Sequence, residues 1–462
     1  MHRTATFQQS RSTSQGHTHR GLALVTLCLA VLVAQVDMAV VNLGTKPIGE
    51  HFSAGVAALQ WVVDSYNLSY AVLLLTGGLL ADLYGRRRIF MAGAVVFTAA
   101  TLLCAAAPSV GWLIAGRALA GFGAALLMPA SLAIIRVVWQ DARERGRTLG
   151  IWAACNGLAM AIGAPLGGVL IHHFGWRSIF LAVVPFSAAA LLLALPSIPE
   201  SSDPQGRSLD AAGQALGGLA LGGLAFAAIH SHEAPGIAAA ALAAAAVAFA
   251  LFLRTERRQG NAALVPPDLF RVRAFRSAMI ATAGMTFGMY GTLFLLPLTW
   301  QDTGMLDATR AGLALIPMAL VFVAVSPFSG RLTAWLGARV MTCGGVAVIG
   351  CGLALIGFSA HPVSIALAEA GLVLTGIGMG LATGPLMGAA VGAVDAARSG
   401  TASALINVAR IAGATLGVAV LGALYALMHG GAHGLRFAML AGSATQLACA
   451  ALAWRTARAG RA

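Results

Sequence analysis

The segment Gly78-Leu79-Leu80-Ala81-Asp82-Leu83-Tyr84-Gly85-Arg86-Arg87-Arg88 decides how the chain is arranged. It lies between two apolar stretches, Trp61 to Leu80 and Ile89 to Ala107, each long enough to cross a membrane as a helix. Gly85 permits the positive φ that a tight reversal between two helices requires. The arginines favour a cytoplasmic position for this turn, and Asp82 can pair with them or with a nearby helix N-terminus. An ordinary basic turn would explain the arginines, but not the spaced Gly, Asp and Gly.

The composition indicates a polytopic membrane protein. Of the 462 residues, 58% are hydrophobic and only 10% are charged, whereas soluble proteins carry about 25% charged residues. The net charge of +13 does not indicate a nucleic-acid partner, because the 29 Lys and Arg residues are unevenly distributed between alternate loops. Most of them lie in one alternate set of loops and in the tails. Four lie in the other set of loops (Lys46, Arg177, Arg310 and Arg436), and two lie within spans (Arg117 and Arg410). This asymmetry places both termini in the cytoplasm.

Apolar segments of about 20 residues, enough to cross a bilayer, recur fourteen times along the chain. The predicted spans are 21–42, 58–81, 88–107, 111–136, 148–171, 178–197, 210–230, 236–254, 276–299, 310–330, 337–358, 363–387, 402–427 and 435–454. The even number agrees with both termini on one side. All six cysteines fall in these spans without a C-x-x-C pair, so they are interpreted as packing residues and no metal or cofactor is expected.

The spans group into two similar halves. The predicted divisions are a cytoplasmic tail 1–20, a six-helix half 21–197, an inserted helix pair 198–254, a cytoplasmic linker 255–275, a second six-helix half 276–454 and a tail 455–462. Residues 1–20 precede a full-length span, which we interpret as an uncleaved helix and not a signal peptide.

Short sequences in the first half recur in the second. Residues 330–339 repeat the pattern of 78–87, with Ala334 in place of the acid. Gly121-Phe122-Gly123 is repeated as Gly376-Ile377-Gly378, and a proline follows each. Paired halves with a binding site between them are typical of transporters.

The segment 78–88 resembles the loop signature of the major facilitator superfamily, G-x-L-A-D-x-x-G-R-[RK]-[RK], at every fixed position. Five further segments are similar to those of its fourteen-span drug–proton antiporter branch: Asp37–Asn42 (D-x-T-I-V-N, with Ala39 for Thr), Gln60–Tyr66, Arg117–Gly121 (R-x-x-Q-G, with Ala120 for Gln), Gly163–Gly168 (G-P-x-x-G-G, with the proline one place late) and Asn407–Arg410. The resemblance covers nearly the whole chain. It implies an all-α integral membrane protein of the major facilitator fold, with two six-helix halves plus two extra central helices.

Four ionisable residues inside the predicted spans are the candidates for proton coupling, because such groups are costly in a bilayer. Counting residues at 1.5 Å rise each places Asp37, Asp64, Arg117 and Glu369 in one layer of the outer third of the membrane. An acid balanced between desolvation and a nearby arginine could load and release a proton near neutral pH. Asp37 is the first candidate for the proton carrier, with Arg117 as its fixed charge partner. The alternative is a permanent structural pair of the two.

The other two acids have plainer interpretations as well. Asp64 could extend a polar helix contact with Asn67, which lies one turn away. Glu369 could face the outer headgroups. We therefore predict Asp37, Asp64 and Glu369 as the proton-coupling set, in that order.

Further polar residues and glycines complete the predicted site. Possible substrate or gate residues are Asn42, Asn156, Asn407 and Arg410, for which helix packing is an equal alternative. The predicted cytoplasmic loop gate consists of Gly78, Asp82, Gly85, Arg86 and Arg87. The predicted antiporter helix carries Gly163, Pro165, Gly167 and Gly168, which permit close approach and bending at a moving interface. Aromatic and methionine residues of the ninth span, including Tyr290, could line an adaptable apolar cavity, although core packing or contact with lipid is the more usual role of such residues.

The sequence thus predicts proton-coupled efflux of drugs, antibiotics or amphipathic metabolites by alternating access across a bacterial cytoplasmic (inner) membrane. The expected partners are a small-molecule substrate, protons and the lipid bilayer, and the protein is expected to act as a monomer. A narrow-specificity metabolite or nutrient carrier of the same fold is the alternative within transport. A membrane enzyme or channel is the alternative outside it, for which we find no nucleophile, metal constellation or filter-like segment. No P-loop occurs, so a gradient is expected to supply the energy.

Overall fold

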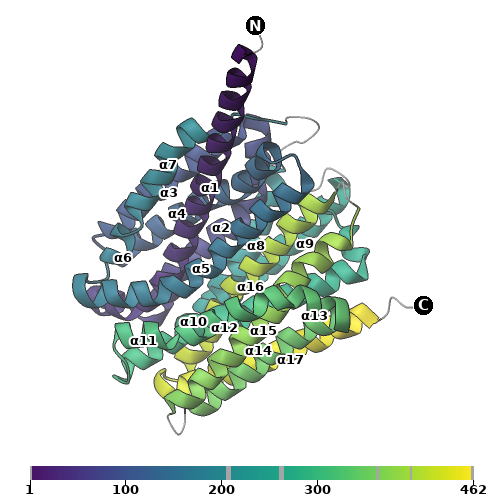
Figure 1. Ribbon diagram of the computed structural model, residues 1–462. Helices are drawn as coiled ribbons and strands as arrows, with labels where there is room; N and C mark the ends of the chain where they lie inside the picture. Colours follow the sequence, from purple (N-terminus) through teal and green to yellow (C-terminus); the bar gives the residue numbers. More distant parts are fainter. Residues whose placement is uncertain (1–2, 204–209, 260–264, 361–363, 396–397, 459–462) are drawn as a thin grey trace.

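The structure is a computed structural model that describes residues 3–203, 210–259, 265–360, 364–395 and 398–458 (Figure 1). These residues are almost entirely helical. The elements are α1 (Arg3–Phe52), α2 (Val56–Tyr84), α3 (Arg86–Ala105), α4 (Val110–Val138), α5 (Ala142–Phe174), α6 (Ser178–Leu181), α7 (Val184–Ser197), α8 (Ala211–Ile229), α9 (Pro235–Gln259), η2 (Leu269–Arg271), α10 (Arg273–Asp302), α11 (Ala308–Ala314), α12 (Ile316–Val325), η3 (Ser326–Phe328), α13 (Ser329–Leu336), α14 (Ala338–Ser359), α15 (Ile365–Gly392), α16 (Ser399–Leu427) and α17 (Gly431–Arg458).

The predicted spans are confirmed as helices. Among the described residues, thirteen helical segments are long and apolar enough to cross a membrane. The remaining predicted span is α5, which has 33 residues and an apolar segment at Ala161–Phe174. Two spans are built from shorter pieces, α6 with α7 and α11 with α12, η3 and α13. Pro185, Pro317 and Pro327 each lie in the first turn of such a piece, where proline fits because its missing N–H needs no acceptor.

The first helix is longer than the sequence-based span. It begins at Arg3, so the predicted tail is helical from that residue, and it continues through Pro47 to Phe52 instead of ending at residue 42. Asp37 is therefore near the middle of the segment Arg20–Phe52, and farther from the end of its helix than the count to residue 42 implied.

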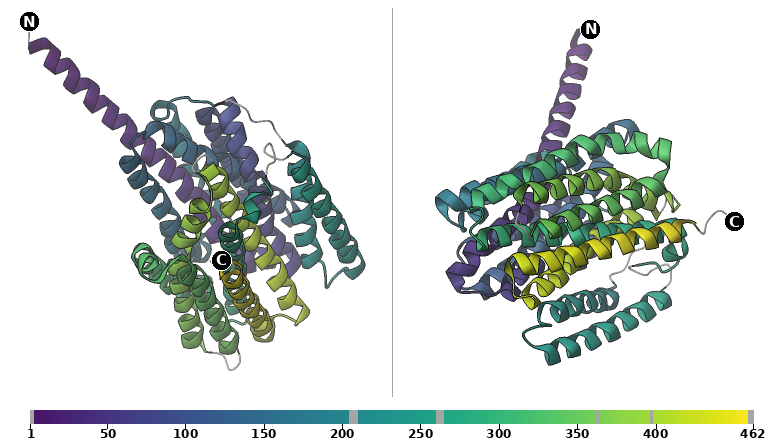
Figure 2. Two further views of the ribbon diagram at one scale, coloured as in Figure 1. Left: turned by 90° about the vertical axis from the view of Figure 1, so that its right-hand side faces the viewer. Right: turned by 90° about the horizontal axis from the view of Figure 1, so that it is seen from below.

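The helices form two bundles with a hairpin beside them. We call α1–α7 the N-terminal bundle and α10–α17 the C-terminal bundle. They meet where α1, α2 and α5 contact α10, α11, α12 and α16, and Figure 1 shows the two bundles on either side of this seam. The α8–α9 hairpin lies on the outside of the molecule (Figure 2), where α8 contacts both α2 and α16. The inserted pair thus covers one side of the seam.

Matching glycines make equivalent contacts in the two bundles. A Cβ on Gly121 of α4 would lie 2.3 Å from the backbone oxygen of Tyr66 in α2, and one on Gly376 of α15 would lie 2.3 Å from that of Met318 in α12. Gly85 and Gly337 have φ of 108° and 85°, and each separates two consecutive helices. These glycines are needed where backbones touch or reverse, which explains why the repeated sequence includes them.

The bundles are joined by polar contacts at one end of the molecule. We call the end that holds the turn 82–88, Arg136–Arg147 and Arg331–Arg339 the basic end, and the other the opposite end. At the opposite end, Lys46 Nζ lies 2.8 Å from Asp302 Oδ1, and Gln60 Nε2 donates to the carbonyl oxygens of Val418 and Ala419 at 2.9 and 2.8 Å. The seam is therefore closed at the opposite end in this structure.

Candidate proton-coupling and substrate site

A fully buried ion pair joins α1 and α4 inside the N-terminal bundle. Arg117 Nη1 donates to Asp37 Oδ2 at 2.5 Å, and both side chains are 1% exposed. The other carboxylate oxygen, Asp37 Oδ1, is buried and accepts no hydrogen bond within the described part of the chain. Burial of two charges is tolerated only when they compensate each other, and the free oxygen is a position at which a proton can add.

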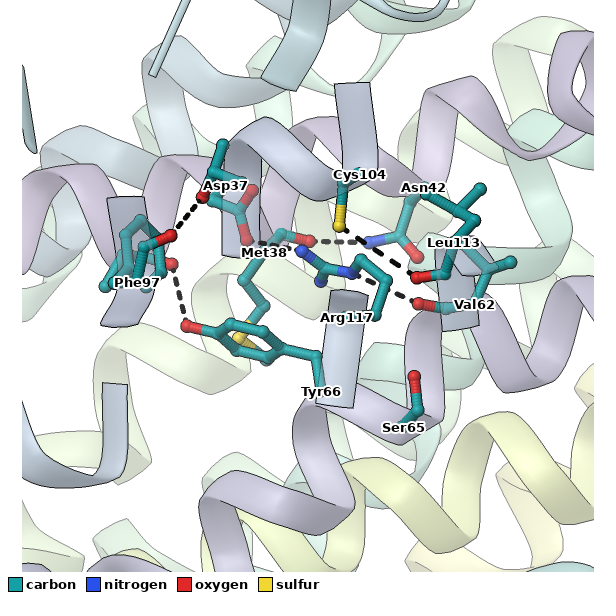
Figure 3. A network of polar contacts seen from close by, with 12 residues as sticks. Asp37, Met38, Asn42, Val62, Ser65, Tyr66, Phe97, Cys104, Leu113 and Arg117 are labelled. Atoms are coloured by element: carbon teal, nitrogen blue, oxygen red, sulfur yellow. Dashed lines mark hydrogen bonds and ion pairs between the residues drawn. The ribbon is translucent and has the colours of Figure 1, made fainter. Parts of the chain in front are cut away.

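Backbone and aromatic contacts hold the guanidinium of Arg117 in place. Its Nε donates to the carbonyl oxygen of Val62 at 3.2 Å, and its Cζ lies 4.5 Å from the centroid of the Tyr66 ring (Figure 3). Tyr66 is in turn fixed by its hydroxyl, which donates to the carbonyl oxygen of Ala34 at 3.2 Å. Arg117 thus keeps two favourable contacts that do not depend on the ionisation of Asp37.

Small residues of α4 make this arrangement possible. A Cβ on Gly116 would lie 2.7 Å from the sulfur of Cys104 in α3, and one on Gly121 would meet the backbone of Tyr66 in α2. The backbone of α4 therefore approaches both α2 and α3 closely. Arg117 lies between these two glycines in sequence, and its side chain reaches Asp37 of α1.

Asp64 is also buried but is not part of the ion pair. Its side chain is 0% exposed, and its two oxygens accept no hydrogen bond from the described residues. Asn67 lies one turn further along α2, with its side chain near the Asp64 carboxylate. The two side chains do not form a hydrogen bond in this structure. Because Arg117 bonds to the carbonyl of Val62, two residues before Asp64, the structure places Asp37, Arg117 and Asp64 in one layer of the N-terminal bundle.

Glu369 is not brought into this group. It is half-buried on α15, a helix of the C-terminal bundle that packs against α10, α12, α14 and α16. No hydrogen bond or ion pair joins it to Asp37 or Arg117 in the described structure. Counting residues from the end of each span gave Glu369 the same depth as Asp37, but such a count does not show that the two acids belong to different bundles.

A second group of polar residues lies where the bundles meet. Arg410 of α16 is half-buried and interacts electrostatically with Tyr70 of α2 and Tyr290 of α10. The hydroxyl of Tyr290 lies 3.9 Å from the sulfur of Met38 in α1. Four helices of the two bundles therefore converge here.

A small cavity adjoins this convergence. Its volume is about 30 Å³, which is enough for one or two water molecules. The residues that line it come from both bundles and include Gln35, Met38, Asn42, Tyr290 and Met318. The predicted gate residue Asn42 thus faces the seam, and its Nδ2 donates to the carbonyl oxygen of Met38.

The remaining predicted gate residues have local roles or undescribed side chains. The amide of Asn407 donates to the carbonyl oxygen of Ser403 at 2.9 Å, within α16, so it does not bind Arg410 in this structure. Asn156 belongs to α5, but its side chain lies outside the described part of the structure.

The glycines of the predicted antiporter helix touch both bundles. Cβ atoms on Gly163 and Gly167 would lie 2.6 and 3.2 Å from the Cβ atoms of Ala39 and Val40 in α1, while one on Gly168 would lie 2.6 Å from the carbonyl oxygen of Ala308 in α11. The hydroxyl of Thr309 also donates to the carbonyl of Gly168 at 3.2 Å. Thus α5 packs on the helix of the buried acid and, through the same motif, on the other bundle. Pro165 is half-buried within this unbroken helix.

The turn between α2 and α3, residues 82–88, is held by two acids. Asp82 Oδ1 accepts from Arg86 Nη2 at 2.9 Å and from Nε at 3.1 Å. Glu200 accepts from the backbone N–H groups of Arg87 and Arg88 at 3.1 and 3.2 Å. Both N–H groups lie in the first turn of α3, which attracts negative charge. A Cβ on Gly85 would lie 2.7 Å from Glu200, so space and its positive φ both require glycine here.

Gly78, a predicted part of this turn, is less tightly placed than its neighbour. A Cβ there would lie 3.3 Å from Pro129, whereas one on Gly77 would lie 2.0 Å from the carbonyl oxygen of Ala125. The closest approach of α2 to α4 is therefore at Gly77, which the motif-based prediction did not include. Glu200 was missed for a different reason, since it lies more than a hundred residues from the turn that it caps.

A larger cavity lies at the opposite end. It has a volume of about 540 Å³, and its walls are formed by α1, α2, α8, α10 and α16, with Lys46, Glu50, Gln60, Asp302 and Tyr425 among the lining residues. Pockets of about 300–1,000 Å³ accommodate small molecules. The Lys46–Asp302 pair crosses its wall, so this vestibule lies outside the closed part of the seam.

Two helical bundles with a polar seam and a buried ion pair define a polytopic membrane transporter. The family model described as Major Facilitator Superfamily matches residues 26–418. The chain therefore belongs to the major facilitator superfamily.

Curated relatives match along most of this chain. It is 35% identical over 411 residues to the "Multidrug resistance protein Stp" of Mycobacterium tuberculosis (strain H37Rv), covering 88% of this chain and 76% of that one. It is 31% identical over 417 residues to the "Multidrug efflux pump LfrA" of Mycolicibacterium smegmatis, covering 90% and 82%. It is 35% identical over 332 residues to the "Methylenomycin A resistance protein" of Bacillus subtilis, covering 70% of each.

A solved structure supports the fold. The bacterial homologue of the human lysosomal transporter Spinster, in an inward-facing and unoccupied conformation, aligns with a TM-score of 0.70 at 19% identity, over 95% of this chain and 97% of that one. The all-α major facilitator fold predicted from the sequence is confirmed.

Proposed function

We propose that this protein exports drugs, antibiotics or amphipathic metabolites from a bacterial cell in exchange for protons, as a transporter without catalytic activity of its own. The single observation that carries the coupling is the buried Asp37–Arg117 pair, whose carboxylate keeps one oxygen free. The names of the relatives, which are multidrug efflux pumps and antibiotic resistance proteins, support efflux as the direction of transport.

Protonation of Asp37 would remove the negative charge of the ion pair inside the N-terminal bundle. A proton on Oδ1 neutralises the carboxylate, so Arg117 loses its counter-charge but keeps the Val62 carbonyl and the Tyr66 ring. The hydroxyl of Tyr66 is bound to Ala34 of α1, and α1 carries Met38 and Asn42 at the seam. A change in charge at Asp37 can therefore reach the seam through α1 itself.

The helix α5 would be the surface on which the bundles move. Gly163 and Gly167 pack on α1, and Gly168 contacts α11. Opening of the opposite end requires separation of Gly168 from Ala308, of Lys46 from Asp302, and of Gln60 from the carbonyl oxygens of Val418 and Ala419. The Lys46–Asp302 pair is partly exposed, so its separation costs little.

The arginine-rich basic end would face the cytoplasm. Both termini would then be cytoplasmic, and the closed opposite end would face outward from the inner membrane. The turn held by Asp82 and Glu200 would fix the relation of α2 to α3 while the bundles rock. We propose that the chain transports as a monomer, with a central seam formed by its own two bundles.

Proton movement in everted vesicles tests this function. Wild type and Asp37→Asn are compared with a series of cationic dyes and antibiotics, with Asp64→Asn and Glu369→Gln as matched variants. We expect proton release from the lumen on addition of a substrate with wild type, and its loss in Asp37→Asn at equal protein yield. An undiminished response in Asp37→Asn would contradict the role of Asp37, and loss in Asp64→Asn or Glu369→Gln alone would assign the proton to that acid. Silence of wild type toward every compound would favour a narrow metabolite carrier.

A further inference from the structure

The second intramembrane arginine has no role in the buried ion pair. Arg410 lies on α16, between α2 and α10, which both pack against that helix. Its Nε is buried and donates no hydrogen bond to any described acceptor. Arginine cannot lose its proton in a protein, so a permanent positive charge lies at the seam.

No carboxylate of the described helices neutralises this charge. The acids on the helices that pack against α16 lie elsewhere along their helices: Asp64 and Asp302 toward the opposite end, Glu369 near the start of α15, and Asp82 at the basic end with Arg86. A charge at membrane depth is costly unless it is compensated, and Arg410 is half-buried with its Nε unpartnered among the described residues. Its guanidinium is therefore available to an anion that enters the seam.

The surroundings of Arg410 suit such an anion. Tyr70 and Tyr290, the two residues with which it interacts electrostatically, carry phenol hydroxyls that can donate hydrogen bonds. Among the described residues, the hydroxyl of Tyr290 has the sulfur of Met38 as its hydrogen-bond partner, and a thioether sulfur is a weak acceptor. Met38 and Met318 line the adjoining cavity, and methionine adapts to apolar groups of different shapes.

We propose that Arg410, Tyr70 and Tyr290 form an anion-binding subsite between the two bundles, which takes the carboxylate or phenolate of an otherwise apolar substrate. The inference rests on the proposed function, because it names one substrate class of the same seam. A guanidinium and two phenol groups form charge-assisted hydrogen bonds with such an anion, and Met38 and Met318 beside the subsite can adapt to its apolar part once the bundles move apart and enlarge the small cavity. The subsite would give the transporter a preference for acidic aromatic compounds over cations of similar shape.

Two xanthene dyes of similar shape and opposite charge test the subsite. Binding of fluorescein, an anion at neutral pH, and of rhodamine 123, a cation, is measured on purified full-length protein by fluorescence anisotropy. Wild type is compared with Arg410→Gln, Arg410→Lys and Tyr290→Phe. Arg310→Gln is the control, because Arg310 is exposed at the opposite end and pairs only with Asp307 among the described residues.

We expect Arg410→Gln to weaken fluorescein binding about tenfold or more, as the loss of a charge-assisted hydrogen-bond donor does, and to change rhodamine 123 binding less than twofold. Arg410→Lys should retain part of the affinity, and Tyr290→Phe should lose a smaller part. Arg310→Gln should bind both dyes as wild type does. An equal loss for both dyes in Arg410→Gln, or no loss for fluorescein, would overturn the subsite. So would equal competition by inorganic phosphate, which lacks an apolar part.

The same dyes separate this inference from the proposed function. Proton-coupled efflux of rhodamine 123 by a wild-type protein that does not bind fluorescein would refute the subsite and leave the function standing. Fluorescein binding that depends on Arg410, without proton movement for any dye, would refute the coupling and leave the subsite standing.

Discussion

The two arginines within the membrane spans differ in almost every physical respect. Arg117 is 1% exposed, pairs with Asp37 and has a carbonyl and an aromatic ring as further partners. Arg410 is half-buried at the seam, and its buried Nε meets no described acceptor. The first charge is satisfied by its own bundle, whereas the second faces the other bundle. The comparison shows that an intramembrane arginine can have two different roles in one protein. Arg117 belongs to a fixed ion pair inside the N-terminal bundle, whereas Arg410 is available for a new partner at the seam.

The largest effect is expected when the internal pair is broken on one side. Arg117→Gln or Asp37→Ala leaves one buried charge without compensation, which costs about 3–5 kcal/mol. The double variant Asp37→Asn with Arg117→Gln removes both charges and should recover most of this stability, because neutral replacement of a buried pair is often tolerated. Thermal unfolding in detergent measures the three stabilities, and proton-coupled efflux should remain absent in the double variant.

A double variant as unstable as the single ones would contradict this account of the pair. It would mean that the shape of the two side chains, and not their charge compensation, holds α1 against α4.

The seam arginine should behave in the opposite way. Arg410→Gln removes a charge that has no described counter-ion, so the stability should change by less than about 1 kcal/mol or rise slightly. The midpoint of thermal unfolding of Arg410→Gln, compared with that of Arg117→Gln under the same conditions, checks this difference. A loss as large as that of Arg117→Gln would show that Arg410 is a structural residue and would remove the contrast.

The sequence predicted the fold well and the site in part, for a physical reason. Membrane-length apolar segments and basic loops are features of local composition. The spans and their order could therefore be predicted from the sequence directly. Residue counting placed Asp37, Asp64, Arg117 and Glu369 in one layer, and in the structure the first three lie near one another in the N-terminal bundle while Glu369 belongs to the other bundle. The contact between Asp37 and Arg117 could not be derived, since it depends on how α4 packs through Gly116 and Gly121.

Other features of the site depend on contacts between distant segments. Glu369 has a similar depth to Asp37 in the sequence count but belongs to the other bundle, and a count along one helix carries no such information. Tyr70 became a candidate only when α2 was found beside α16. Glu200 is separated from the turn it caps by four spans. The extension of α1 through Pro47 was missed because the end of an apolar run was taken as the end of the helix.

An intermediate effect is expected where the bundles touch through backbone. A valine at Gly168 would press against the carbonyl oxygen of Ala308 in α11, and overpacking of this kind costs about 1–3 kcal/mol. Because the contact joins the bundles, Gly168→Val should open the opposite end. Labelling of Asn42→Cys, in a background without other cysteines, by an impermeant maleimide added from outside should increase about tenfold.

The matched control is Gly163→Val, whose new side chain meets Ala39 of α1 within one bundle. It should lower thermal stability without an increase in labelling. Equal labelling of Asn42→Cys in both variants would contradict the assignment of Gly168 to the moving interface.

The smallest effect should come from an exposed ion pair, which completes the contrast with Asp37 and Arg117. Asp268, in the linker before α10, accepts a hydrogen bond from Arg398, and this contact lowers the pKa of Asp268 below its ordinary value. A lowered pKa in the folded state stabilises the protein above the ordinary aspartate pKa of about 3.9, and the contribution is lost as the pH falls through the folded value. The side chains of Arg398 and Asp268 are 38% and 49% exposed, so the pair should contribute no more than about 1 kcal/mol of stability.

Thermal unfolding between pH 7 and pH 3 should therefore show a slightly smaller acid-induced loss of stability in Arg398→Gln than in wild type. A difference as large as that expected for Arg117→Gln would mean that burial does not govern the strength of ion pairs in this protein.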